Sequence, residues 1–282
     1  MTASSGERLT FGERFLERAE NFGQLCVGMD PHLSILEAWG LPANVEGVEA
    51  FSKICVEAFA DVACVVKPQV AFYEQFGSAG LAVLEQSIAE LRRAGVLVVA
   101  DAKRGDIGST MAGYARAWLD PDSPLSSDAV TVSPWLGFDS LRPVIELGEQ
   151  HGKGVIVLAA TSNPEAVELQ RSLFHGSEAN LAQHIVDRVA EENSVHGEAG
   201  NLGVVVGATL AQPPRLDRVG GMVLMPGVGA QGGTMEDVRR IAGGKQTARL
   251  VSPNVSRGVL KAGPDVAALR AAVVEHAATL RL

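Results

Sequence analysis

The segment Met222-Val-Leu-Met-Pro-Gly-Val-Gly-Ala-Gln-Gly-Gly-Thr234 decides between the folds that are open to this chain. It starts as a short apolar strand and continues into a glycine loop, Gly227–Gly232, which formally matches the dinucleotide motif G-x-G-x-x-G. That motif belongs to the first βαβ unit of a sheet and needs an acidic residue about 20 positions later. Here the loop follows the seventh predicted strand, and residues 247–257 contain no Asp or Glu. The position of the loop and the missing acidic residue therefore exclude a dinucleotide site.

The same loop suits a phosphate site in a (β/α)₈ barrel. Glycines such as Gly229 and Gly232 let the backbone approach a phosphate closely, and a helix that opens at Thr234 offers N–H donors. In such barrels a phosphate commonly lies between the loops after strands seven and eight. Arg257, at the end of the eighth predicted strand, would add a planar cation for the phosphate oxygens. The alternative is a tight glycine turn beside a solvated arginine.

Seven other short apolar runs accompany this strand, each ending in polar or glycine-rich residues. Several are apolar at nearly every position, as expected for parallel strands that are covered by helices. The eight predicted strands are Leu25–Asp30, Cys64–Gln69, Val96–Lys103, Ala129–Pro134, Gly154–Ala160, Leu202–Thr209, Met222–Val228 and Arg249–Arg257.

Helical patterns separate these strands. The segment after Thr209 contains two prolines and should form only a short helix. The remaining predicted helices are Phe51–Ala63, Ala79–Ala94 with Ser78 as its cap, Ile107–Leu119, Ser140–His151, Ala179–Glu192, Met235–Ala242 and Val266–Leu280.

Strands that alternate with helices indicate either a (β/α)₈ barrel or a long doubly wound sheet. The phosphate loop favours a single α/β TIM barrel with helical insertions. The amphipathic stretch Phe11–Phe22 predicts an extra N-terminal helix across the bottom or side of the barrel. We therefore expect an N-terminal extension and helix over residues 1–24 and a barrel domain over residues 25–282.

Composition excludes several classes of protein. The 282 residues are 46% hydrophobic, enough for a sizeable core, and the formal charge is −9, with no basic run for nucleic acid or an anionic membrane. No apolar run reaches the ~20 residues of a membrane helix, and the first eight residues lack the apolar core of a signal peptide. The three cysteines and six histidines lack metal-ligand spacing. We therefore expect a cytoplasmic protein with buried reduced thiols and no metal site.

The end of the third predicted strand carries charges of both signs. Strand alternation places Leu97, Val99, Asp101 and Lys103 on one face, so the last two would emerge together at the carboxyl-terminal mouth of a barrel. Barrel enzymes place their chemistry at that mouth. The alternative is a structural ion pair, with the following Asp106 acting only as a helix cap.

Two further charges end neighbouring strands in the same manner. Lys67 follows the apolar run of the second strand, and Asp30 ends the first. Ionisable groups at the end of an apolar strand are costly to desolvate unless an opposite charge pairs with them or they take part in binding or catalysis. The sequence therefore predicts that charges of both signs meet at the carboxyl-terminal mouth of the barrel, where an active site is expected.

Asp101-Ala-Lys-Arg-Gly-Asp106 resembles the D-x-K-x-x-D signature of the orotidine 5′-phosphate decarboxylase family. Asp30-Pro, Lys67-Pro-Gln and the glycine loop occur in the order of that family and at its strand ends, and the similarity runs from about Leu25 to Leu260. The length and the helical insertions resemble its longer bacterial subgroup.

This resemblance implies a homodimer that decarboxylates orotidine 5′-phosphate to uridine 5′-phosphate (UMP) without a cofactor, the last step of UMP synthesis. It implies that Lys103 protonates C6 of the pyrimidine, that Asp101 faces the departing carboxylate and that Asp106 reaches into the site of the neighbouring subunit. The remaining implied contacts are Lys67 and Asp30 with the ribose hydroxyls, Ser162 with the pyrimidine amide, and Gln231 and Arg257 with the phosphate.

Two alternatives remain at this point. A sugar-phosphate barrel of the same superfamily, such as a hexulose-phosphate synthase, would need a divalent metal bound by acidic residues near the same motif. A non-catalytic barrel would bind a nucleotide phosphate without turnover. The intact set of Asp101, Lys103 and Asp106 favours a catalyst over the second alternative.

Overall fold

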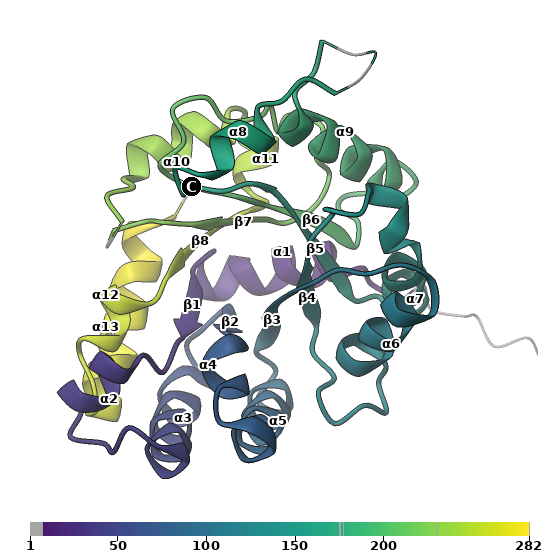
Figure 1. Cartoon of the computed structure of the whole chain (residues 1–282). Helices are drawn as coiled ribbons and strands as arrows, with labels where there is room; N and C mark the ends of the chain where they lie inside the picture. The colour runs from purple at the N-terminus through teal and green to yellow at the C-terminus, as the bar shows by residue number, and fades with distance from the viewer. Residues whose placement is uncertain (1–7, 175, 177, 230, 282) are drawn as a thin grey trace, which may run out of the picture.

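Eight parallel strands close into a single barrel in chain order (Figure 1). The structure is a computed structural model that describes residues 8–174, 176, 178–229 and 231–281. Its strands are β1 (Cys26–Met29), β2 (Val65–Pro68), β3 (Leu97–Arg104), β4 (Ala129–Val132), β5 (Gly154–Ala160), β6 (Leu202–Val206), β7 (Val223–Pro226) and β8 (Val251–Val255). Because β1 pairs with both β2 and β8, the sheet has no free edge. The predicted barrel is confirmed, and the doubly wound alternative is wrong.

Side-chain alternation along β3 separates two buried clusters. Leu97 and Val99 point into the barrel, where they pack with residues such as Ile156 of β5. Val98 and Ala100 point outward into the larger cluster that joins the strands to the helices. Successive residues of a strand face opposite sides, so this alternation also directs Asp101 toward the barrel interior.

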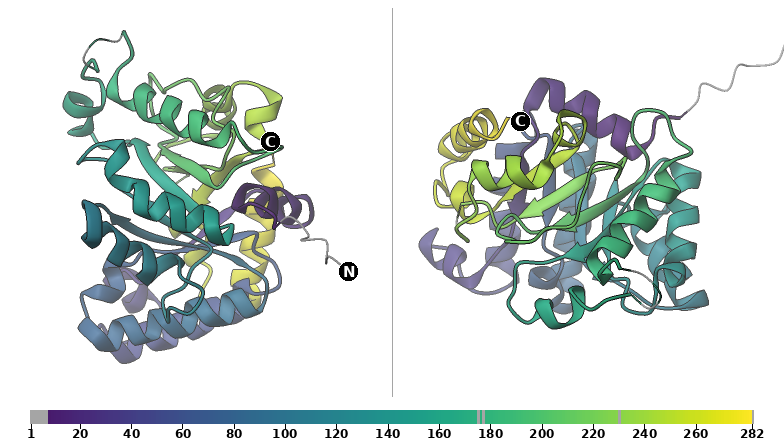
Figure 2. Two further views of the ribbon diagram at one scale, coloured as in Figure 1. Left: turned by 90° about the vertical axis from the view of Figure 1, so that its right-hand side faces the viewer. Right: turned by 90° about the horizontal axis from the view of Figure 1, so that it is seen from above.

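Helices surround the barrel on its outer side (Figures 1 and 2). They are α2 (Leu33–Ala38), α3 (Val45–Phe59), α4 (Ala71–Glu74), α5 (Gly77–Arg93), α6 (Gly108–Leu119), the 3₁₀ helix η1 (Phe138–Leu141), α7 (Arg142–His151), α8 (Ala166–Gln170), α9 (Leu181–Asn193), α10 (Met235–Ala242), α11 (Lys245–Ala248), α12 (Arg257–Leu260) and α13 (Val266–Thr279). None of the helices in the described ranges is both long and apolar enough to cross a bilayer.

Three helix predictions need correction. Ser78 is not a cap, because α5 already begins at Gly77 and follows Phe76 without a side-chain cap. α3 starts six residues before the predicted Phe51, since the side chain of Asn44 accepts a hydrogen bond from the Gly47 N–H at 3.0 Å and starts the helix there. The short helix expected after Thr209 is wrong: residues 207–222 form only turns, bends and irregular segments, and the two prolines lack the N–H groups that a helix needs.

The predicted extra N-terminal helix is present as α1 (Phe11–Phe22), and it covers the end of the barrel where the strands begin (Figure 2). Phe11 and Phe15 are buried in the cluster that fills the barrel interior. Arg14 donates to the Asp128 carboxylate at 2.8 Å and to the carbonyl of Gly152 at 2.9 Å, which ties the helix to the start of the sheet. The division of the chain into an extension and a barrel domain at residue 25 stays a prediction.

Candidate active site

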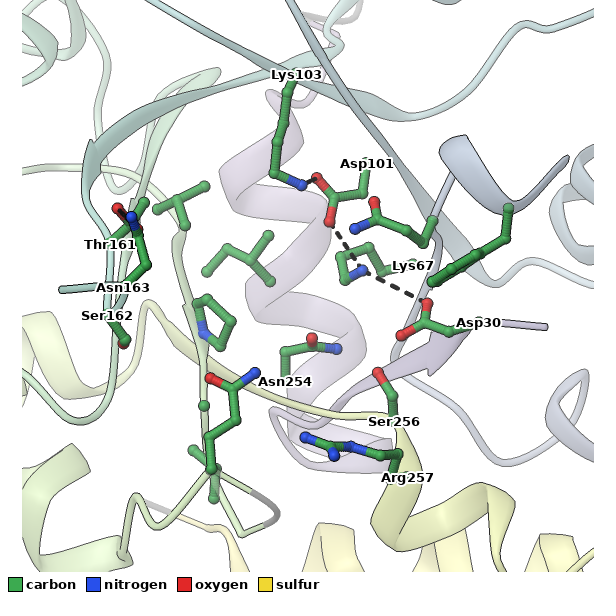
Figure 3. A pocket seen from close by; sticks show the side chains of 18 of the residues that line it. Asp30, Lys67, Asp101, Lys103, Thr161, Ser162, Asn163, Asn254, Ser256 and Arg257 are labelled. Atoms are coloured by element: carbon green, nitrogen blue, oxygen red, sulfur yellow. Dashed lines mark hydrogen bonds and ion pairs between the residues drawn. The ribbon is translucent and has the colours of Figure 1, made fainter. Parts of the chain in front are cut away.

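A pocket of about 570 Å³ lies at the mouth of the barrel, at the carboxyl ends of the strands (Figure 3). Its lining combines charged side chains with apolar residues from the barrel wall. The polar and charged side chains in the lining are Asp30, His32, Ser34, Lys67, Gln69, Asp101, Lys103, Thr161, Ser162, Asn163, Gln231, Asn254, Ser256 and Arg257.

The Asp101 carboxylate accepts hydrogen bonds from several elements at once. Lys67 Nζ of β2 lies 2.9 Å from its Oδ2, and Lys103 Nζ lies 2.5 Å from its Oδ1. The hydroxyl of Thr131 on β4 donates to Oδ1 at 2.9 Å. With its amide nitrogen turned toward Asp101, Gln69 donates to Oδ2 at 2.9 Å and to the backbone carbonyl at 2.8 Å. Asp101 therefore ties the ends of β2, β3 and β4 together.

Charge pairing outweighs burial in this group. Burial alone would raise the pKa of Asp101, but the ammonium groups of Lys67 and Lys103 hold that pKa well below its usual range. Burial alone would lower the pKa of Lys67, but Asp101 and then Asp30, whose Oδ1 lies 3.8 Å from Lys67 Nζ, hold that pKa above its usual value. Asp101 and Lys67 are therefore both charged at neutral pH.

Lys103 is the part of this group that faces the pocket most openly. Its side chain is 44% exposed, compared with 5% for Lys67. Figure 3 shows Lys103, Asp101, Lys67 and Asp30 joined in a row along one wall. An ammonium that is held beside a carboxylate and reaches into a pocket can stabilise negative charge there and donate a proton to it.

Part of the opposite wall comes from the loop after β5. Thr161, Ser162 and Asn163 follow β5 and lie across the pocket from Lys103 in Figure 3. A Cβ at Gly207, which follows β6, would lie 2.0 Å from Ser162 Oγ, so a glycine there allows the two loops to approach. Ser162 Oγ is buried and has no hydrogen-bond partner among the described residues.

Seven of the ten predicted site residues line this one pocket. They are Asp30, Lys67, Asp101, Lys103, Ser162, Gln231 and Arg257. Arg257 begins α12 rather than ending β8.

Asp106, Gly229 and Gly232 are not among the lining residues. Asp106 lies in the turn after β3, where its Oδ1 accepts from the N–H of Ile107 at 2.7 Å. Gly229 (φ 74°) and Gly232 (φ 90°) adopt backbone conformations that favour glycine and shape the loop after β7. Ala230 of the same loop lies outside the described residues.

Sequence reasoning assigned no role to seven other polar residues that line the pocket, among them Gln69, Asn254 and Ser256. Gln69 stands two positions after Lys67, and Asn254 lies on β8 with its Nδ2 donating to the carbonyl of Cys26 at 3.0 Å. Strand alternation could have placed both on the inner face. The side chain of Ser256 packs over Gly28 of β1, where a Cβ would lie 1.8 Å from Ser256 Oγ. That contact depends on how β8 meets β1 and leaves no signal in the sequence.

No group of three or more His, Cys, Asp or Glu side chains within the described ranges is placed to hold a metal ion. The three cysteines are buried free thiols, two of them inside the barrel. Burial raises the pKa of Cys26 to about 12 and that of Cys64 to about 12, so both remain protonated at neutral pH.

A family model described as "Orotidine 5'-phosphate decarboxylase / HUMPS family" matches residues 23–272. The chain belongs to this family. The family predicted from the Asp101–Asp106 signature is thereby confirmed.

Relatives and solved structures agree with this assignment. The orotidine 5′-phosphate decarboxylase of Corynebacterium glutamicum is 62% identical over 273 residues, which cover 96% of this chain and 97% of that protein. A crystal structure from Streptomyces avermitilis ma-4680 has a TM-score of 0.93 at 48% identity and covers 99% of this chain and 98% of its own. The OMP decarboxylase of Leishmania donovani has a TM-score of 0.74 at 30% identity and covers 96% and 98%, respectively.

The charge pairing around Asp101 predicts a pH-dependent contribution to stability. At pH 7, Asp101→Asn should lower the free energy of unfolding by about 3 kcal/mol, because Lys67 loses a buried partner. The pKa of Asp101 is lower in the folded than in the unfolded state, so the unfolded state takes up the proton first as the pH falls below about 4. The difference between wild type and variant should therefore shrink toward pH 3, as measured by urea denaturation. A difference that stays constant from pH 7 to pH 3 would contradict this pairing.

Proposed function

We propose that this protein decarboxylates orotidine 5′-phosphate to UMP and carbon dioxide, the final step of de novo pyrimidine synthesis. The observation that carries the proposal is the charged group of Lys67, Asp101 and Lys103 at the mouth of a barrel whose family includes this enzyme. The 62% identity to a curated orotidine 5′-phosphate decarboxylase over nearly the whole chain supports the same substrate.

The reaction needs a fixed cation beside the carbon that loses carbon dioxide. When the C6–carboxylate bond breaks, its electron pair stays on C6 in the plane of the ring, orthogonal to the π system, so resonance cannot absorb it. In our proposal Lys103 Nζ stabilises this pair electrostatically and then donates a proton to C6. The lysine becomes neutral, and C6 gains the hydrogen of UMP.

Asp101 has two roles in this scheme. Its Oδ1 lies 2.5 Å from Lys103 Nζ, so it holds the ammonium group in place by a charge-assisted hydrogen bond. It also faces the carboxylate of the substrate, and repulsion between the two is relieved as carbon dioxide leaves. Lys67 and Asp30, which line the same wall, would bind the ribose hydroxyls.

The far side of the pocket would hold the rest of the nucleotide. Ser162 is proposed to contact the pyrimidine amide, and Arg257 with Gln231 to bind the phosphate, helped by the backbone of the loop that contains Gly229 and Gly232. Energy from binding this remote phosphate can be used to orient the ring against Lys103.

Asp106 is proposed to act in the site of a second copy of the chain. It does not line the pocket of its own subunit. Exposed apolar side chains lie next to it in the sequence and on the adjoining loop after β4: Ile107 is 62% exposed, Trp135 69% and Leu136 52%. The two loops start next to each other, because the N–H of Ser133, just after β4, donates to the carbonyl of Arg104, the last residue of β3, at 2.7 Å. Such a surface favours a homodimer with shared sites. The cytoplasmic location likewise remains a proposal.

Lys103→Ala tests the chemistry. We expect decarboxylation of orotidine 5′-phosphate, followed by ultraviolet absorbance, to fall by about 10³-fold or more, because the electrostatic partner and the proton donor are lost together. UMP binding and the circular dichroism spectrum should be retained. Lys53→Ala, which removes an exposed lysine on α3, is the matched control. Substantial turnover by Lys103→Ala would refute the role of the lysine, and loss of wild-type activity with a metal chelator would favour the metal-dependent sugar-phosphate alternative.

Arg257→Ala tests the phosphate anchor. We expect kcat/KM for the nucleotide to fall by about 10- to 100-fold, the usual effect of losing a charged hydrogen bond. The unphosphorylated nucleoside should be affected little, since it has no phosphate for Arg257 to bind. Arg239→Ala removes an exposed arginine of α10 outside the pocket and is the control. Equal losses of kcat/KM for the nucleotide and the nucleoside would contradict a phosphate-binding role for Arg257.

Mixing two inactive variants tests the shared site. In a hybrid dimer of Lys103→Ala and Asp106→Ala, one site carries both defects and the other carries neither. Random exchange in a two-fold dimer should therefore restore about a quarter of the wild-type specific activity. Mass spectrometry verifies the exchange between subunits. No recovery after verified exchange would count against a site that uses Asp106 of a second subunit.

A further inference from the structure

The backbone of Lys103 adopts a conformation that side chains other than glycine rarely take. Its φ is 48°, and it is the one non-glycine residue with positive φ in the part of the chain that the structure describes. Such a conformation persists only where the surroundings hold it in place, and it is concentrated at functional sites. Contacts around Lys103 must therefore hold its backbone in this conformation.

The pairing of β3 with β4 changes at this point. Ala100 pairs with Val130 and Arg104 with Val132, so the three residues 101–103 of β3 face the single Thr131 of β4. The Lys103 N–H therefore has no regular partner in the strand ladder. It donates instead to the side-chain hydroxyl of Thr131 at 2.9 Å.

The same hydroxyl also contacts the Asp101 carboxylate. Thr131 Oγ1 donates to Asp101 Oδ1 at 2.9 Å, and Asp101 Oδ1 also accepts a hydrogen bond from Lys103 Nζ at 2.5 Å. A backbone N–H can only donate and an ionised carboxylate can only accept, so the one hydroxyl proton must point to Asp101. Thr131 is fully buried, and water does not compete for these bonds.

We propose that Thr131 is a positioning residue for the decarboxylation, because its hydroxyl links the backbone of Lys103 to the carboxylate of Asp101. Thr131 Oγ1 thus holds both the backbone position from which the lysine side chain starts and the carboxylate that pairs with its ammonium group. Thr131 does not line the pocket, so it acts only through these two residues. This inference rests on the proposed function, and the experiment below separates the two.

Two substitutions distinguish the hydroxyl from the shape of the side chain. Thr131→Val keeps the branched shape and removes the hydroxyl, whereas Thr131→Ser keeps the hydroxyl. We expect Thr131→Val to lower kcat for orotidine 5′-phosphate by about 10- to 100-fold, the effect of a small misplacement of catalytic groups. Its Kd for UMP should change by less than about threefold, because the nucleotide contacts remain. Thr131→Ser should restore kcat to within about threefold of wild type.

Thr247→Val is the matched control. Thr247 is 3% exposed on α11, and its hydroxyl donates to the carbonyl of Leu216 at 3.3 Å, outside the pocket. The Thr247→Val variant also loses a buried hydroxyl, and its kcat should match that of the wild type. A purely structural role for Thr131 would lower stability as Thr247→Val does without the selective loss of kcat.

A crystal structure of Thr131→Val completes the test without relying on turnover. We expect Lys103 to leave the left-handed region or the Asp101 carboxylate to turn away from its present position. Unchanged positions of both residues would overturn the inference, as would wild-type kcat in Thr131→Val or failure of folded Thr131→Ser to recover it. Absence of wild-type decarboxylation would refute the proposed function alone, since the crystal structure would still decide whether the hydroxyl holds the two residues.

Discussion

An ionised carboxylate that lies out of water needs a partner for each of its oxygens, and Asp101 meets this need with donors from three strands. Lys67 approaches from β2, Lys103 from β3 itself and Thr131 from β4. The ends of these strands cannot separate without leaving a buried charge unpaired, which is strongly unfavourable. The same contacts hold two ammonium groups beside the pocket before a substrate binds. The contacts that stabilise the fold at this edge are therefore the same contacts that position the groups of the proposed reaction.

The remainder of the barrel supports this edge from below. Interior residues such as Val99 and Leu224 pack beneath the charged group, and α1, whose Phe15 belongs to the same cluster, covers the opposite end of the barrel. Above the strands, the loop after β5 carries Ser162 and the start of α12 carries Arg257, two residues that are proposed to bind the nucleotide. A packed interior below and variable loops above allow a barrel to hold reactive groups rigidly while the loops select the substrate.

Particular residues show how far sequence reasoning reached. The apolar runs predicted all eight strands, and the alternation from Leu97 to Lys103 correctly placed Asp101 and Lys103 at one mouth. Helix starts were less predictable: α3 begins at Val45 because the Asn44 side chain caps it, whereas Ser78 lies inside α5. The packing of the whole helix overrides a weak local signal such as a single serine. The family signature predicted a site that includes Asp101 and Lys103, which line the pocket, but it contains no information on Asn254.

The sequence by itself determined which strands form, which face of β3 is charged and which family the chain belongs to, because periodicity and local motifs are properties of neighbouring residues. Only the tertiary structure decided that Thr131 meets both Asp101 and Lys103 and that Ser256 packs over Gly28. These contacts depend on an irregular register in which three residues of β3 face one residue of β4, and on closure of β8 against β1. Register and closure are set by how all eight strands pack together, and no local pattern specifies them.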